Sequence, residues 1–421
     1  MKQKIGMRSY ITAFCIAMSS NMGFSVAYAY TSYYVAFQTA TGFTNTQLGL
    51  LLTVLGIAST VLYLPGGFLA DRFNVRTLTT VGLIGAGATG FLIALFPSYS
   101  FMMLIYCAFA VFAVLIAWNP QMKMLRMLSS DEDQGKIQTA RAYGRTLPVL
   151  IISLGGSALL ALLPTEKAAL QVTLCLYGAL AIIPAIIAAF TFKPVAQETV
   201  PQAPAETSSI SLREYLSVMK MKDVWLIGLI GFSAYTANAG ITYLQPYLTE
   251  IFGISAATSS AFGIIAKNCA LLSAPILTFL GGRKKMSVTK ALGLALAVSA
   301  VCVSLFILMP MSSGMLLIAV IIYMVAALGI MGSWALQFTP VAEIGIPMAI
   351  SGTAIGIISM FSFVSDIFFS AICGNLLDRF GLDGYKYVFA LTVVILVAGV
   401  LACFNIAKKV QKSRQEQAAA S

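Results

Sequence analysis

Hydrophobic residues occur in this chain in long runs that are separated by short polar segments. Twelve runs have the roughly 20 mostly apolar residues that an α-helix needs to cross a bilayer. They are centred near Ser25, Ser59, Gly87, Phe109, Ser153 and Ala179, and then near Ala237, Lys267, Val298, Met324, Ile358 and Val394. The pattern predicts twelve transmembrane helices, which we number as spans 1 to 12.

A polar stretch divides the runs into two sets of six. It covers roughly residues 193–222 and contains PVAQETVPQAPAETSS, which has too few apolar residues to form a core. We therefore expect an N-terminal six-helix bundle over 1–192, a cytoplasmic linker over 193–222, and a C-terminal bundle with a short cytoplasmic tail over 223–421. The expected fold is an all-α membrane protein with two pseudo-symmetric six-helix bundles.

The two sets also share short sequence echoes. Span 4 ends with Trp118-Asn-Pro-Gln121, and span 10 ends with Trp334-Ala-Leu-Gln337. Span 2 opens with Thr44-Asn-Thr-Gln47, which fits a capping box. Matching segments in two halves are typical of transporters that arose by duplication.

Composition excludes a water-soluble fold. Of the 421 residues, 59% are hydrophobic and only 10% are charged, whereas soluble domains carry about 25% charged residues. The excess of 26 Lys and Arg over 15 Asp and Glu lies in the short loops. It indicates membrane topology and no nucleic-acid partner.

The basic residues favour one side of the membrane at almost every loop. If the N-terminus is cytoplasmic, the outer loops carry only Lys167, Arg379 and Lys386, and the remaining loop Lys and Arg residues lie inside. The first apolar run is longer than a signal-peptide core, so we expect it to be retained as span 1. We predict a multi-pass protein of the bacterial cytoplasmic (inner) membrane with both termini in the cytoplasm.

The sequence offers no catalytic constellation. It has no histidine, and its seven cysteines are scattered through the apolar runs. We interpret these cysteines as small, buried hydrophobic residues. No nucleophile–base set, metal cluster or phosphate-binding loop is present. We therefore expect no enzymatic activity, no metal and no cofactor.

The loop after span 2 carries a recognisable motif. Residues 66–76 read GGFLADRFNVR and resemble the signature G-x-L-x-D-R-x-G-x-R of the major facilitator superfamily. The resemblance implies two bundles that rock about a site in the middle of the membrane. It also implies a conformational latch formed by Gly67, Asp71, Arg72 and Arg76, in which Asp71 pairs with an arginine or with a helix N-terminus. Asn74 replaces the usual glycine, and asparagine tolerates a left-handed backbone.

Two further segments narrow the resemblance. Residues 118–145 and 343–389 are similar to the YihN-like bacterial permeases, which are related to carriers of organophosphates and organic anions. This branch implies no definite substrate. The glycine-proline signature of drug exporters is not present in span 5.

Three charged residues lie inside spans, where charges are costly and usually functional. Lys267 lies in span 8, Arg145 in span 5 and Asp366 in span 11. Several carriers of carboxylates and inorganic anions in the superfamily place a cation in span 8, so Lys267 is our first candidate for substrate contact. The alternative is a structural ion pair with Asp366, or a pair that the substrate breaks. Arg145 could supply a second cation or extend to the interface, and Asp366 could carry a proton.

The family resemblance also implies that spans 1, 4, 7 and 10 line the cavity. Polar residues with helical spacing lie along spans 1 and 7, and spans 4 and 10 each add a tryptophan. The candidate lining residues are Asn21, Ser25, Tyr28, Trp118, Tyr235, Asn238, Gln245 and Trp334. Their alternative role is hydrogen bonding between helices.

These observations predict a secondary transporter that moves a small polar metabolite by alternating access. Two cations inside the spans favour an organic anion as substrate, and a proton or a counter-transported anion would be the second solute. The expected partners are the small-molecule substrate and the lipid bilayer, and the expected state is a monomer. A carrier of a neutral solute or drug, and a ligand sensor with a transporter fold, are the alternatives.

Overall fold

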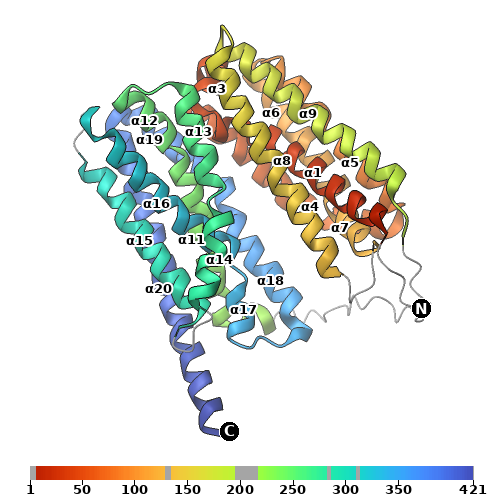
Figure 1. The fold of residues 1–421 in the computed structure, drawn as a ribbon, viewed down its shortest axis with the longest axis vertical. Helices are drawn as coiled ribbons and strands as arrows, with labels where there is room; N and C mark the ends of the chain where they lie inside the picture. Colours follow the sequence, from red (N-terminus) through yellow and green to blue (C-terminus); the bar gives the residue numbers. More distant parts are fainter. Residues whose placement is uncertain (1–5, 129–133, 195–216, 282–285, 310–312, 421) are drawn as a thin grey trace. The chain divides into compact units, whose positions relative to one another are not determined.

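In the computed structural model, residues 6–128, 134–194, 217–281, 286–309 and 313–420 are described, and these residues form helices and short connections without strands (Figure 1). The chain divides into two compact units. One contains Met1–Ala203 with Ala256–Ala261, and the other contains Pro204–Ser255 with Phe262–Ser421. The predicted linker lies for the most part in 195–216, outside the described residues, so its boundaries remain a prediction.

The N-terminal unit contains spans 1 to 6. Its elements are α1 (Met7–Ala27), α2 (Ala29–Ser32), α3 (Tyr34–Thr41), α4 (Asn45–Arg72), α5 (Val75–Ala94), α6 (Tyr99–Ala110), η1 (Val111–Trp118), α7 (Asn119–Arg126), α8 (Gln134–Leu162) and α9 (Glu166–Thr191). Helix α9 packs against α1 and α5, and α1 also packs against α8. The capping box of α4 is confirmed, since the Thr44 side chain accepts from the Gln47 amide and the Gln47 side chain accepts from the Thr44 amide.

The C-terminal unit contains spans 7 to 12. Its elements are α11 (Lys222–Thr242), α12 (Leu244–Phe252), α13 (Ala256–Lys267), α14 (Ala270–Gly281), α15 (Val288–Leu308), η3 (Ser313–Met315), α16 (Leu316–Ala335), α17 (Thr339–Glu343), α18 (Met348–Phe363), η4 (Val364–Ile367), α19 (Phe369–Phe380), η5 (Gly381–Asp383) and α20 (Gly384–Ala420). Helix α13 is divided, with Ala256–Ala261 in the N-terminal unit and its remaining residues in the C-terminal unit. Helix α11 packs against α16, α18 and α20.

Eleven described segments are long and apolar enough to cross a membrane. The last of them, Ala354–Lys412, has 59 residues, which is far more than the roughly 20 of one crossing. It includes most of α18, all of α19 and most of α20, and the chain turns between α19 and α20 at Gly381, whose φ is 54°. This segment therefore holds spans 11 and 12, in agreement with the twelve expected.

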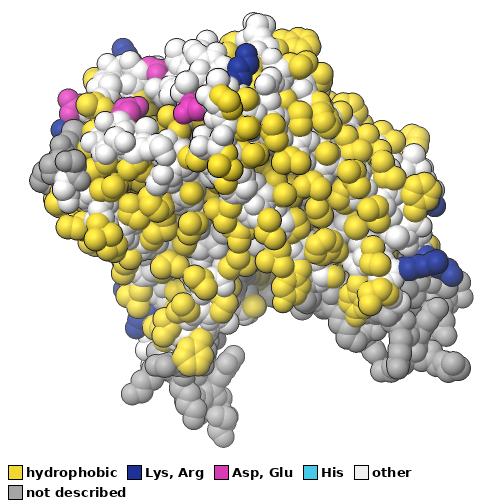
Figure 2. Space-filling view, turned by 45° about the horizontal axis from the view of Figure 1, so that its top comes forward, with side chains coloured by type: hydrophobic (Ala, Val, Ile, Leu, Met, Phe, Trp, Pro, Cys, Tyr) yellow, Lys and Arg dark blue, Asp and Glu magenta, His cyan; other side chains and the backbone are white. Residues whose placement is uncertain are grey.

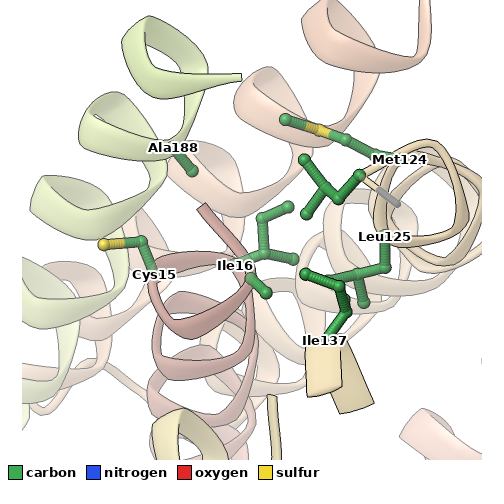
Figure 3. Close-up of a cluster of buried hydrophobic side chains, with 8 residues drawn as sticks. Cys15, Ile16, Met124, Leu125, Ile137 and Ala188 are labelled. Carbon is green, nitrogen blue, oxygen red and sulfur yellow. The ribbon is translucent and has the colours of Figure 1, made fainter. Parts of the chain in front are cut away.

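The surface and the interior both fit a bilayer environment. Hydrophobic side chains predominate on the face shown in Figure 2, and charged side chains lie at its margins. Among the exposed large residues are Leu308, Leu317 and Phe190, which are 79%, 72% and 81% exposed. Inside the N-terminal unit, a buried cluster joins Ile16 of α1, Leu125 of α7 and Ile137 of α8 (Figure 3).

Several spans are interrupted rather than continuous. Span 1 breaks at Tyr28 and Tyr33, span 7 at Tyr243, span 8 after Lys267, and span 11 at η4. The sequence did not predict these breaks. Lipid cannot satisfy backbone groups that a break would free. Amides at these breaks bond to nearby carbonyls of the same span, as the Tyr33 amide does to the Ala29 carbonyl and the Asn268 amide to the Ile265 carbonyl.

The breaks in spans 1 and 7 are secured in the same way. The Tyr33 hydroxyl donates to the carbonyl oxygen of Ser153 in α8, at 2.8 Å. The Tyr243 hydroxyl donates to the carbonyl oxygen of Ser370 in α19, at 2.9 Å. Both tyrosines are buried, and each links the first span of its unit to the fifth span. The two units therefore share this tyrosine contact in addition to the short sequence segments that they have in common.

We predict that Tyr33→Phe lowers the free energy of unfolding by about 0.5–2 kcal/mol, because a buried hydroxyl bond is lost while the ring remains. Thermal unfolding of the detergent-purified protein measures the change. Tyr143→Phe is the matched control, since the Tyr143 side chain is 58% exposed. Equal midpoints for the two variants would contradict the role of Tyr33.

Candidate functional site

Lys267 is the last residue of α13, at the point where span 8 is interrupted. The following residue, Asn268, turns its side-chain amide back to the Ile264 carbonyl at 2.8 Å, which closes the end of the helix. The Lys267 side chain is half-buried. A cation in the last turn is favoured by the partial negative charge at a helix C-terminus. The interruption therefore gives this lysine an environment that a continuous helix in lipid lacks.

Asp366 lies in η4, three residues before α19 begins. A carboxylate near a helix N-terminus is favoured by the partial positive charge of the free amide groups. The Tyr235 hydroxyl of α11 donates to Asp366 Oδ2 at 2.8 Å. The structure thus joins two residues that the sequence singled out separately, one as a candidate for the coupling site and one as a cavity-lining residue. The ion pair between Lys267 and Asp366 stays a prediction.

In the N-terminal unit the structure brings Asn21 and Arg145 together. Asn21 Nδ2 donates to the backbone carbonyl of Arg145 at 2.6 Å. Helix α8 approaches α1 closely here, because a Cβ at Gly144 would overlap the Phe14 carbonyl oxygen. The Arg145 side chain is exposed on this unit although it lies within a candidate span. Asn21 therefore fixes the backbone from which Arg145 projects.

The other predicted residues of span 1 lie beside Asn21 or at a helix end. The Ser25 hydroxyl donates to the Asn21 carbonyl at 2.9 Å, within its own helix. Tyr28 is half-buried and follows the last residue of α1. Both positions are thus on or next to the interruption of span 1.

The two tryptophans occupy equivalent surroundings in their units. Trp118 ends the π-helical turn η1 and meets Phe24 of α1 edge to face, with centroids 5.8 Å apart. Trp334 of α16 packs against Tyr235 of α11, with centroids 5.7 Å apart. In each unit, the tryptophan of the fourth span therefore contacts an aromatic residue of the first span.

The remaining candidates of span 7 differ in their exposure. The Oδ1 atom of Asn238 is buried, and no donor among the described residues bonds to it. Such an atom normally binds a ligand or water. Gln245 is fully buried in α12 and packs against Gly263 of α13, where a Cβ would overlap its amide. Its surroundings match the alternative role, contact between helices.

The predicted latch is described only in part. Gly67 and Asp71 belong to α4, but their side chains lie outside the described residues, so the latch stays a prediction. Arg72 and Arg76 are exposed at the adjoining helix ends. The reason given for Asn74 was wrong: its φ is −63°, and its side chain caps α5 by accepting from the Arg76 amide at 2.9 Å.

The sequence places two charged residues, Lys123 and Glu343, near the inner ends of spans 4 and 10. The structure shows that both bind neighbouring helices, and these contacts were not predicted. Lys123 Nζ donates to the Ala70 carbonyl near the end of α4, at 3.0 Å. Glu343 accepts from the Val288 and Thr289 amides at 2.8 and 2.9 Å, and from the Thr289 hydroxyl at 2.6 Å. The positive charge of Lys123 thus meets the partial negative charge at the C-terminus of α4. The negative charge of Glu343 meets the partial positive charge at the N-terminus of α15. Their partners are distant in sequence, so spacing gave no signal.

The chain is similar in sequence to a known family and to two proteins of Escherichia coli. The model of the Major Facilitator Superfamily matches residues 10–343. The chain is 26% identical over 423 residues to the inner membrane protein YqcE of Escherichia coli K12, with 98% of each chain covered. It is 23% identical over 395 residues to YihN of the same organism, covering 92% of this chain and 93% of YihN.

A solved structure of similar fold is a bacterial homologue of the human lysosomal transporter Spinster, in an inward-facing and unoccupied conformation. It has 15% sequence identity and a TM-score of 0.74, and the match covers 96% of this chain and 98% of that one.

We predict that Glu343→Gln lowers the free energy of unfolding by about 1–2 kcal/mol, because the amide removes the charge that complements the N-terminus of α15. Thermal unfolding checks this. Asp383→Asn is the control, because the Asp383–Lys386 pair is exposed and such pairs contribute little. A loss as large in the control would contradict the assignment.

Proposed function

The chain belongs to the major facilitator superfamily, and we propose on this basis that it is a secondary active transporter that moves a small organic anion across the inner membrane. The family prediction made from residues 66–76 is confirmed by the match over 10–343, and the similarity to YihN agrees with the expected branch. The fold is that of a membrane transporter. Both termini are cytoplasmic in our proposal, as the placement of loop Lys and Arg favours.

The observation that carries the proposal is the position of Lys267. It lies in the middle of a candidate span, at an interruption of the helix, and is half-buried. A lysine at this depth needs an anionic or aqueous partner. A cation in the middle of a span would attract the carboxylate or phosphate of an anionic substrate during the transport cycle.

Arg145 and Asp366 complete the proposed machinery. Arg145 supplies a second cation inside a span, and its guanidinium suits a carboxylate or phosphate. Asp366, held by the Tyr235 hydroxyl, is assigned to coupling, either by carrying a proton or by pairing with Lys267 when substrate is absent. A protein that carries a neutral solute would use Lys267 and Asp366 only to neutralise each other.

We predict that Lys267→Ala abolishes binding of the substrate anion without preventing folding. A thermal-shift screen against small acids, sugar phosphates, sugars and drugs measures binding, since a ligand at a hundredfold excess over its Kd stabilises a protein by about 2.7 kcal/mol. Lys386→Ala is the control, because Lys386, in the first turn of α20, forms an exposed ion pair with Asp383. The control should keep the shift that Lys267→Ala loses.

Two results would contradict the proposal. One is normal anion binding and flux in a monodisperse Lys267→Ala protein. The other is stabilisation of the wild type only by neutral or cationic compounds, which would favour the carrier of a neutral solute or drug.

We also predict that Asp71→Asn slows exchange across the membrane more than it weakens binding, because the motif acts on the equilibrium between transport states and not on the site. Counterflow in proteoliposomes and equilibrium binding, measured on the same preparation, separate the two effects. Unchanged turnover in Asp71→Asn would remove the latch from the mechanism.

A further inference from the structure

Three aromatic side chains meet beside Asp366 in the C-terminal unit. The Tyr235 ring lies 4.8 Å from that of Phe363 at an interplanar angle of 84°, and 5.7 Å from that of Trp334 at 51°. The three rings come from α11, α18 and α16, respectively. Since Tyr235 also holds Asp366, the rings and the carboxylate form one group.

These rings are not a closed core. Phe363 is 39% exposed, and Trp334, Tyr235 and Asp366 are half-buried. A second aromatic cluster in the same unit offers a direct contrast. It joins Tyr247, Phe306, Tyr385 and Phe389, with centroids between 5.4 and 6.2 Å apart, and all four side chains are at most 2% exposed. The buried cluster stabilises the fold, whereas the cluster at Asp366 keeps ring surface accessible.

Lipid is a poor partner for the accessible cluster. A half-exposed carboxylate three residues after Phe363 would be costly against acyl chains. In a binding site the same combination is favourable, because apolar rings bind a ligand and a few polar groups orient it. A carboxylate accepts up to about four hydrogen bonds, so Asp366 has capacity for a ligand donor in addition to the Tyr235 hydroxyl.

We propose that the C-terminal unit binds the ring of a cyclic organic anion against Trp334 and Phe363, with a ring hydroxyl donating to Asp366. The inference rests on the proposed function in one respect: the anionic group of the ligand is assigned to Lys267. Its new content is the substrate class, a hydroxylated ring that carries a carboxylate or phosphate. Trp334 and Phe363 determine the preference for a ring, and Asp366 determines the preference for its hydroxyl.

The test compares ligands of equal charge with the purified full-length protein. D-glucuronate, a ring, is matched with D-gluconate, an open chain of the same carbon number. Para-hydroxybenzoate is matched with heptanoate for the ring, and with benzoate for the hydroxyl. Ring contacts contribute about as much as a tenfold change in Kd. We expect at least one ring acid to bind about tenfold more tightly than its open-chain partner.

The variants assign the preference to residues. Trp334→Leu should equalise ring and open-chain acids, and Phe363→Leu serves the same purpose if Trp334→Leu does not fold. Phe190→Leu is the matched control, because Phe190 is 81% exposed on the other unit; it should keep the preference. Asp366→Ala should remove the advantage of para-hydroxybenzoate over benzoate.

The outcomes separate this inference from the proposed function. Equal binding of ring and open-chain acids by the wild type contradicts the ring site but leaves an anion carrier intact. A ring preference that persists in both Trp334→Leu and Phe363→Leu also contradicts it. Failure of every acid here, and of every acid and sugar phosphate in the thermal-shift screen, to bind contradicts the proposed function itself.

Discussion

The constraint on which this structure depends is that lipid satisfies no hydrogen bond. A continuous helix meets the constraint on its own, but spans 1, 7, 8 and 11 are interrupted. Backbone groups at the breaks therefore need partners other than lipid, and several amides there bond to carbonyls of their own span. At two of the breaks, the hydroxyls of Tyr33 and Tyr243 tie the first span to the fifth span of the same unit by donating to its carbonyl groups. The breaks are thus built and repeated features of the fold.

The interruptions also explain why charges are tolerated inside the spans. Lys267 lies at the carboxyl end of one half-helix and Asp366 just before the amino end of another. Each charge is complemented by the partial charge of a helix terminus. Short helix segments thereby create sites for ions in the middle of a membrane. Glu343 and Lys123 apply the same principle at the ends of spans 10 and 4.

The sequence predicted those features that depend on local pattern. The spans follow from hydrophobic length, and the capping box at Thr44 follows from side-chain spacing. The breaks could not be predicted, because Tyr28 and Tyr243 in apolar runs look like ordinary helix residues. The contact of Asn21 with the Arg145 backbone requires the close approach at Gly144, which only packing decides. Tyr235 and Asp366 were each selected by polarity, but 131 positions separate them.

The central claim is that candidate lining residues of spans 1 and 7, such as Ser25 and Asn238, face water. Alkylation by a water-soluble maleimide in membrane vesicles tests it most directly, after the seven native cysteines are replaced. Single cysteines are placed at Ser25 and Asn238, and at Val298 of α15, which is 51% exposed and apolar. The account predicts rapid labelling at the first two positions, protection by a bound anion, and no labelling at the third. Unreactive cysteines at both Ser25 and Asn238 would contradict it and leave those residues as contacts between helices.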